Sequence, residues 1–91
     1  MDRNAELFSR FANKTVVLDL SSPYVAIGEF SSADDNFVVL NNADIHDMRE
    51  SRTTRDIYLI QAKENGIRVN RRSVTIRKEE IVAIAMLNDV T

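Results

Sequence analysis

The sequence predicts a mainly β protein, with a short helix followed by a strongly bent antiparallel sheet of five short strands. Two observations carry this expectation. Short apolar runs alternate with polar turn residues along most of the chain. Gly28 stands in the middle of one such run, where glycine is unfavourable unless the strand bends there or approaches another backbone. A length of 91 residues favours a single domain, residues 1–91, with one core.

The first half of the chain contains a helix and three of the strands. Residues 3–13 place Leu7, Phe8 and Phe11 at helical spacing, which predicts a short amphipathic helix over the core. Turns rich in Ser, Asp and Asn separate the strands that follow. The predicted strands are residues 15–20, 24–30 and 37–45, and the predicted turns are residues 21–23 and 31–36.

The segment from residue 54 to residue 65 fits two templates. In the preferred interpretation, Thr53 caps a helix with Asp56 three residues later, and Gly66 ends it as a left-handed cap. In the other, Asn65 and Gly66 form the tight turn of a β-hairpin, which the consecutive apolar residues 57–60 favour.

The last two predicted strands, residues 73–77 and 81–87, are joined by four charged residues, 77–80. Such a turn is either a solvated loop or a place where a charge is held for a partner. In the last strand, Ile81, Ala83 and Ala85 alternate with Val82 and Ile84, so both faces are apolar. One face can pack in the subunit's own core, and the other face or the strand edge can meet a neighbouring subunit.

The charge of the chain is unevenly distributed. The whole chain carries a net charge of -2, whereas residues 49–78 contain nine basic and three acidic residues, a net charge of +6. This segment is either a solvated face or an electrostatic footprint for an anionic polymer. Arginines recur every three residues in it, a spacing that can follow a phosphate backbone or form salt bridges within the segment.

Composition and motifs exclude several classes of protein. The chain has no Cys, which excludes disulfides and thiolate metal sites and is consistent with the cytoplasm. We expect no signal peptide and no membrane span. His46, between Asp44 and Asp47, could ligate a metal or act as a base, but a lone His at a strand end is more often a polar surface group. With no catalytic motif, we expect no enzyme activity, cofactor, metal or small-molecule substrate.

The order of elements resembles the Sm and Sm-like (Lsm) family, as a divergent bacterial or phage-type member. The first family motif has a bend glycine, an apolar residue, a polar turn with Asp and an apolar strand. Gly28, Phe30, Asp34 or Asp35, and residues 37–40 match it. In the second motif, Ile-Arg-Gly precedes two spaced aliphatic residues. The matching positions are Ile76, Arg77, Lys78, Ile81 and Ile84, with Lys78 where the family has Gly.

This resemblance implies an Sm-like, SH3-type barrel with an enlarged loop, residues 46–70, before the fourth strand. It also implies a ring-shaped homo-oligomer in which both turns lie near the centre and bind single-stranded RNA. By position, the candidate RNA-binding residues are Asn36, Asp35, Arg77 and Lys78. The arginines expected on the rim are Arg49, Arg52, Arg55, Arg71 and Arg72. Two alternatives stay open: Arg77 can pair with an acid such as Glu79, and the chain can be a structural or regulatory module without RNA binding.

Overall fold

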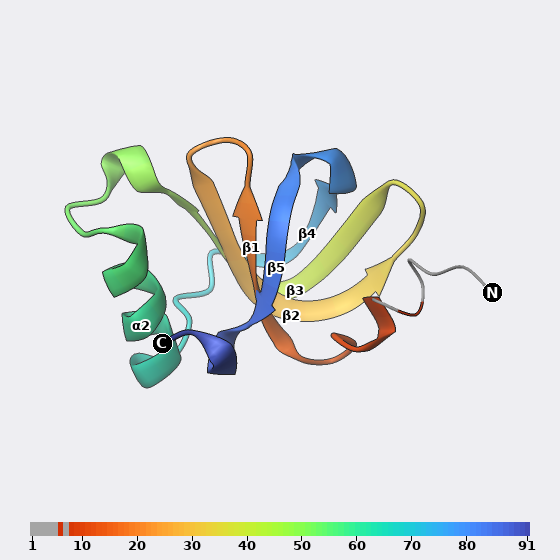
Figure 1. Ribbon diagram of the computed structural model, residues 1–91, viewed down its shortest axis with the longest axis horizontal. Coiled ribbons are helices and arrows are strands. Elements are labelled where there is room, and N and C mark those ends of the chain that lie inside the picture. The colour runs from red at the N-terminus through yellow and green to blue at the C-terminus, as the bar shows by residue number, and fades with distance from the viewer. Residues whose placement is uncertain (1–5, 7) are drawn as a thin grey trace.

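The computed structural model describes Glu6 and residues 8–91, which form one antiparallel sheet with a helix on one side (Figure 1). The strand order is β4-β3-β2-β1-β5, so β4 and β5 are the edges. The bounds of the strands are β1 Thr15–Leu20, β2 Tyr24–Ala33, β3 Phe37–Asp47, β4 Arg71–Arg77 and β5 Ile81–Met86. Helix α2 is Arg55–Asn65, and short 3-10 turns are η1 Met48–Glu50, η2 Lys78–Glu80 and η3 Leu87–Asp89. The predicted mainly β, five-stranded, strongly bent fold is confirmed.

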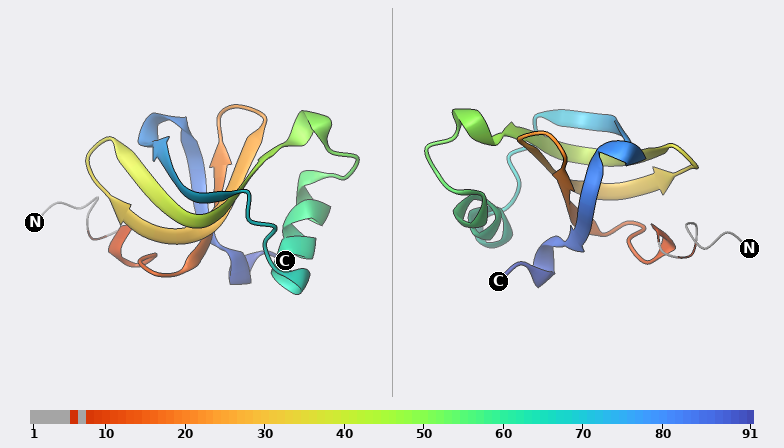
Figure 2. Two further views of the ribbon diagram at one scale, coloured as in Figure 1. Left: turned by 180° about the vertical axis from the view of Figure 1, so that it is seen from behind. Right: turned by 45° about the horizontal axis from the view of Figure 1, so that its top comes forward.

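Strands β2 and β3 are longer than the sequence indicates. Ser32 pairs with Val39 and Ala33 pairs with Val38, so the predicted turn 31–36 shrinks to residues 34–36. Ser31 and Ser32 are exposed, and this end of β2 stays in the sheet through the backbone pairing of Ser32 and Ala33 with β3 rather than through burial of side chains. The two long strands form the curved hairpin that is seen from behind in Figure 2.

The sheet bends where Gly28 faces β3. Ile27 pairs with Asp44 and Glu29 pairs with Asn41, so β3 has one extra residue there, a β-bulge. Asn42 in this bulge has a φ of 49°, a left-handed conformation that Asn tolerates better than most residues. A Cβ on Gly28 would lie 2.9 Å from the Cβ of Ala43. The glycine is therefore required by the close approach of β3.

One face of the sheet holds the main core. Its buried members come from all strands except β5, and they are Val16, Leu18, Ala26, Phe30, Val38, Leu40, Ala43 and Ile76. Phe8 and Phe11 pack against this cluster from the N-terminal segment, as predicted. The helix predicted for residues 3–13 is seen only in part: Glu6, Phe8 and Ser9 are helical, residues 10–12 form a turn, and residues 1–5 and 7 lie outside the described part of the chain.

Within residues 54–65, Arg55–Asn65 form helix α2, and the hairpin alternative is wrong. The N-cap is Thr54 rather than Thr53, because the Thr54 hydroxyl accepts the N–H of Ile57 at 3.2 Å. The helix ends at Gly66 as predicted, with a φ of 92°, although its ψ of 168° is not that of a left-handed helical residue. Leu59 and Ala62 are buried against the second face of the sheet. That second cluster also contains Val17, Val25, Ile27 and Leu87.

The strict alternation predicted for the last strand is wrong at one position. Asp19 pairs with Ala83 but Leu20 pairs with Ile81, so Val82 is an extra residue in a bulge. Ile81 and Ile84, on the two sides of this bulge, both pack against the main core. Val82 remains 71% exposed at the edge of the sheet.

Candidate nucleic-acid interface

The structure brings the two charged turns together. The N–H of Lys78 donates to the carbonyl of Asn36 at 2.8 Å, and Phe37 pairs directly with Arg77 across β3 and β4. A pocket of about 390 Å³ lies between them. Its lining residues are Asp35, Asn36, Phe37, Arg77, Lys78 and Glu79. All four predicted RNA-binding residues are therefore neighbours around one pocket.

Asp34 shapes the first of these turns. Its Oδ1 accepts the N–H groups of Asn36 and Phe37, each at 2.8 Å, in an Asx-type turn. These two backbone hydrogen bonds lower the pKa of Asp34, because they favour the ionised carboxylate. The sequence offered Asp34 or Asp35 for the family's turn position. The structure gives Asp34 the conformational role and leaves Asp35 beside the pocket.

Arg77 is held by acids of its own turn. Its guanidinium lies 3.2 Å from Glu79 and 3.3 Å from Glu80, and its side chain is 61% exposed. The alternative in which Arg77 pairs with Glu79 thus describes this structure. Exposed pairs of this kind contribute only roughly 0–1 kcal/mol. An anionic or aromatic ligand could therefore replace the two glutamates as the partner of the guanidinium at a small cost in free energy.

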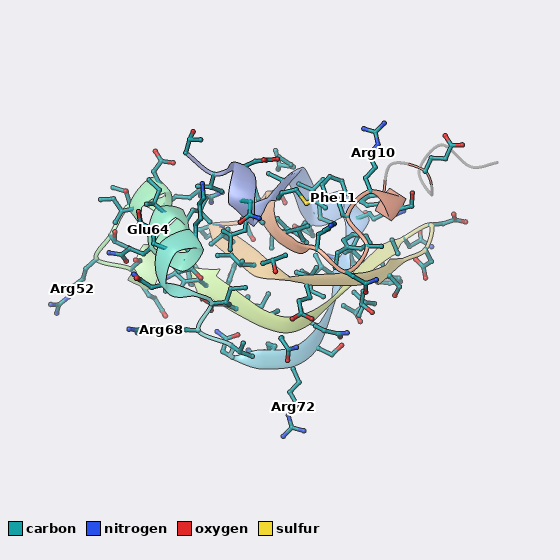
Figure 3. All side chains as sticks on the ribbon, turned by 90° about the horizontal axis from the view of Figure 1, so that it is seen from below. Arg10, Phe11, Arg52, Glu64, Arg68 and Arg72 are labelled. Carbon is teal, nitrogen blue, oxygen red and sulfur yellow. The ribbon has the colours of Figure 1, made fainter. Side chains whose placement is uncertain are left out.

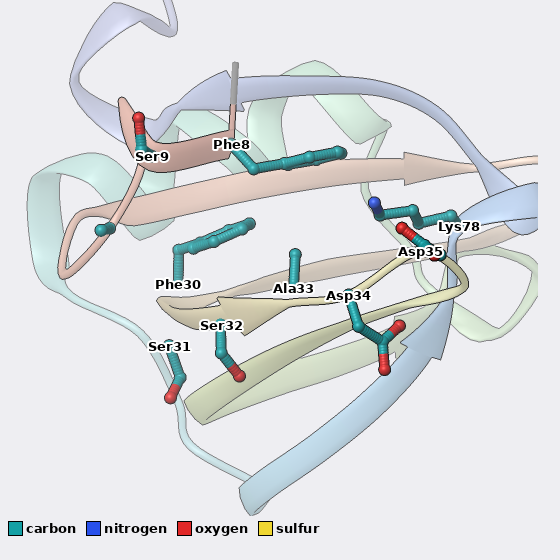
Figure 4. Close-up of a pocket in the computed structure, with 10 residues that line it drawn as sticks. Phe8, Ser9, Phe30, Ser31, Ser32, Ala33, Asp34, Asp35 and Lys78 are labelled. Atoms are coloured by element: carbon teal, nitrogen blue, oxygen red, sulfur yellow. The ribbon is translucent and has the colours of Figure 1, made fainter. Parts of the chain in front are cut away.

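Lys78 points toward the N-terminal segment. Its Nζ lies 4.4 Å from the centre of the Phe8 ring, and Phe8 stacks on Phe30 with the ring centres 5.8 Å apart. Figure 4 shows the lysine reaching toward Phe8 beside Asp35. A cation over an aromatic face is attracted by the ring's quadrupole. Lys78 therefore links the second turn to the N-terminal segment.

Phe37 is a candidate that the sequence analysis missed. Phe37 is 38% exposed at the start of β3 and shares the pocket with its cross-strand partner Arg77. An exposed aromatic face can stack on a nucleic-acid base. The available signal is an aromatic residue directly after the Asp-Asn turn, which the apolar pattern of residues 37–45 assigns only to the strand.

The arginines expected on the rim do not form one equivalent row. Arg49 binds Asp47 through two hydrogen bonds, of 3.1 and 2.8 Å, and Arg55 binds Asp19 of β1 at 2.7 Å. Arg71 donates to the carbonyl of Asn70 at 2.9 Å. Within residues 8–91, Arg52 and Arg72 form no ion pair, and both extend away from the molecule in Figure 3. Arg49 and Arg55 are thus already engaged in hydrogen bonds with carboxylates of the protein itself.

His46 is a packed residue rather than a polar surface group. Its ring stacks on Tyr58 of α2 with the centres 4.5 Å apart, and its Nε2 is buried without a hydrogen-bond partner in the described structure. The Tyr58 hydroxyl donates a hydrogen bond to Asp44. Burial of the Tyr58 hydroxyl, together with this hydrogen bond, raises the pKa of Tyr58. Among the described residues, no three His, Asp or Glu side chains are grouped to hold a metal ion.

The fold is that of Sm proteins. A scan against protein-family models and a search of curated proteins find no match. Among solved structures, the Pyrococcus abyssii Sm protein in complex with a uridine heptamer is similar at 19% identity. Its TM-score is 0.61, and the match covers 93% of this chain and 99% of that one.

Two further structures have the same fold. The SmAP (LSm) protein of Methanococcus vannielii is 18% identical, with a TM-score of 0.57 over 94% of this chain and all of the other. A chain of the NatC complex bound to Gag peptide and CoA is 15% identical, with a TM-score of 0.55 over 86% of this chain and 87% of the other. In the described part of the chain, no helix has the length and apolar character needed to cross a membrane.

Proposed function

We propose that this chain is a non-enzymatic, cytoplasmic member of the Sm-like family that assembles into a ring and binds single-stranded RNA at the two joined turns. The observation that carries the proposal is the hydrogen bond from Lys78 to Asn36, which holds the β2–β3 and β4–β5 turns at one pocket. The shared fold with an Sm protein in complex with a uridine heptamer supports it.

The residues around this pocket fit the chemistry of a single-stranded nucleotide. Phe37 offers an exposed ring on which a base can stack, and Arg77 lies directly across the strands from it. The guanidinium can stack on the same base or pair with a phosphate. The side-chain amide of Asn36 has both donors and acceptors for a base edge. Arg52 and Arg72 add a weaker attraction that is independent of sequence.

The decisive experiment removes the guanidinium of the pocket. Replacing Arg77 by Ala should weaken binding of oligo(U) or oligo(A) by about tenfold, because stacking or charged contacts of this type are worth roughly 1–3 kcal/mol. Arg72→Ala, on the same strand but outside the pocket, is the matched control and should change affinity less than threefold. Fluorescence anisotropy at low salt measures both variants, and sedimentation checks that assembly is unchanged. Equal affinities for the two variants would contradict the pocket.

A second candidate function is a structural or regulatory module without RNA. The internal pairs of Arg77 with Glu79 and Glu80 favour it, since they satisfy the guanidinium in the absence of a ligand. The similar chain of the NatC complex places this fold in a complex with a peptide and CoA. RNA affinity that falls steeply with salt distinguishes the first function from the second. The absorbance ratio of the purified protein at 260 and 280 nm reports any co-purified nucleic acid.

A further inference from the structure

A second pocket is lined by residues of β3, of α2 and of the segments on either side of α2. Helix α2 lies on the other side of the molecule from the β2–β3 turn (Figure 1). The volume of the pocket is about 560 Å³, within the range of roughly 300–1,000 Å³ that is typical of small-molecule sites. The residues that form it belong to the insert and to the end of β3. It is therefore separate from the joined turns of the proposed RNA pocket.

The floor of this pocket is a fixed carboxylate. Asp44 is only 6% exposed, and its two oxygens accept hydrogen bonds from the Tyr58 hydroxyl and, at 2.9 Å, from Nδ2 of Asn70. Asn70 is itself held by Ile45, whose N–H donates to its Oδ1 at 3.0 Å. Each carboxylate oxygen has a second lone pair, so Asp44 can accept a further donor from a ligand. The floor is thus a hydrogen-bond acceptor whose two oxygens are oriented by Tyr58 and Asn70.

The walls and the mouth have a different chemistry. Val69 is 51% exposed and gives an apolar wall, while Gln61 and Asn65 lie one turn apart on α2. Arg68 supplies a positive charge and extends outward in Figure 3. Within residues 8–91, no hydrogen bond or ion pair engages the side chains of Gln61, Asn65 and Arg68. These donors and acceptors are available to a ligand.

We propose that this pocket binds a nucleotide whose base is adenine or cytosine, the two bases that carry an amino group at C6 or C4 where guanine and uracil carry a carbonyl. The amino group donates toward Asp44, the flat base packs on Val69, and the amides of Gln61 and Asn65 pair with the base edge. The phosphate lies at the mouth, where Arg68 can bind it with two parallel hydrogen bonds. A uracil base presents a carbonyl where the amino group would be, and that oxygen is repelled by the carboxylate.

The test is a titration of the intact protein with AMP and UMP, followed by calorimetry and by NMR shifts of residues 58–70. We expect AMP to bind at least fivefold more tightly than UMP, and Arg68→Gln to weaken AMP binding about tenfold. Arg10→Gln removes an exposed arginine that lies outside this pocket and should leave AMP binding unchanged. Absence of AMP binding at millimolar concentration, equal affinity for UMP, or equal effects of the two arginine variants would overturn the proposal.

A second arm identifies the source of the nucleotide and separates this site from the RNA pocket. In the Arg77→Ala background, displacement of oligo(A) by saturating AMP shows that an RNA chain supplies the nucleotide. Binding of AMP without such displacement identifies a free nucleotide as the ligand. Because Arg77 does not line this pocket, AMP affinity should be the same with and without Arg77→Ala. A loss of AMP binding in that variant would assign the nucleotide to the joined turns and overturn the second site.

Discussion

Single side chains decide the shape of the candidate interface. Asp34 closes the β2–β3 turn through two backbone N–H groups, and this leaves Asp35 and Asn36 at the pocket. Two adjacent aspartates are equivalent in a sequence pattern, and only the backbone conformation tells which one accepts the turn's hydrogen bonds. Gly28 is different, because an apolar run with a glycine in its middle indicated in advance that the chain is crowded or bent there.

Replacing Gly28 by Val should destabilise the protein by roughly 1–3 kcal/mol, because the new Cβ would meet that of Ala43 at 2.9 Å and the backbone of β3 just behind it. Chemical denaturation gives the free energy of unfolding. Ser32→Val is the matched control: it places the same side chain on the same strand at an exposed position, and its effect should stay within about 0.5 kcal/mol. Similar stabilities for the two variants would argue against crowding at the bend.

At the scale of elements, the sequence predicted each strand and helix α2. It was least accurate where pairing with a neighbouring strand sets the register. The bulge at Val82 depends on how β5 pairs with β1, so the alternation along residues 81–87 could not reveal it. Residues 57–60 favoured a strand because four apolar residues are consecutive. In the fold Leu59 is buried whereas Ile57 is exposed, so tertiary packing selects the helix. The contact between α2 and the second face of the sheet was not predicted.

The cap of α2 gives a sharp comparison between adjacent threonines. Thr54→Ala should cost about 1 kcal/mol of stability, because it removes the acceptor of the Ile57 N–H at the helix start. Thr53→Ala makes the same chemical change one residue earlier, where the side chain does not cap the helix, and should cost less than about 0.5 kcal/mol. Thermal unfolding of both variants checks this expectation. A larger loss for Thr53→Ala would mean that the helix begins one residue earlier in solution.

At the scale of the whole molecule, the sheet has two open edges. The strand order ends at β4 and β5, and the described residues show no pairing between these two strands. Unpaired edges invite pairing with another chain, and a cyclic ring removes every such edge. Ile84 of β5 packs against the subunit's own core, so a charge there would unfold the chain before it reported on a neighbour.

Val82 is the better position for testing the ring that we propose. It belongs to edge strand β5 and is 71% exposed, so Val82→Lys adds a charge of the kind that blocks edge pairing while the core stays intact. The parent should sediment as a multiple of 10.4 kDa at micromolar concentration, and the variant should shift toward the monomer with an unchanged circular dichroism spectrum. Ile57→Lys, which puts the same charge on an exposed apolar position of α2, outside both edge strands, should leave the assembly intact. A parent protein that sediments only as a 10.4 kDa monomer, or an equal loss of assembly in both variants, would contradict pairing through the β5 edge.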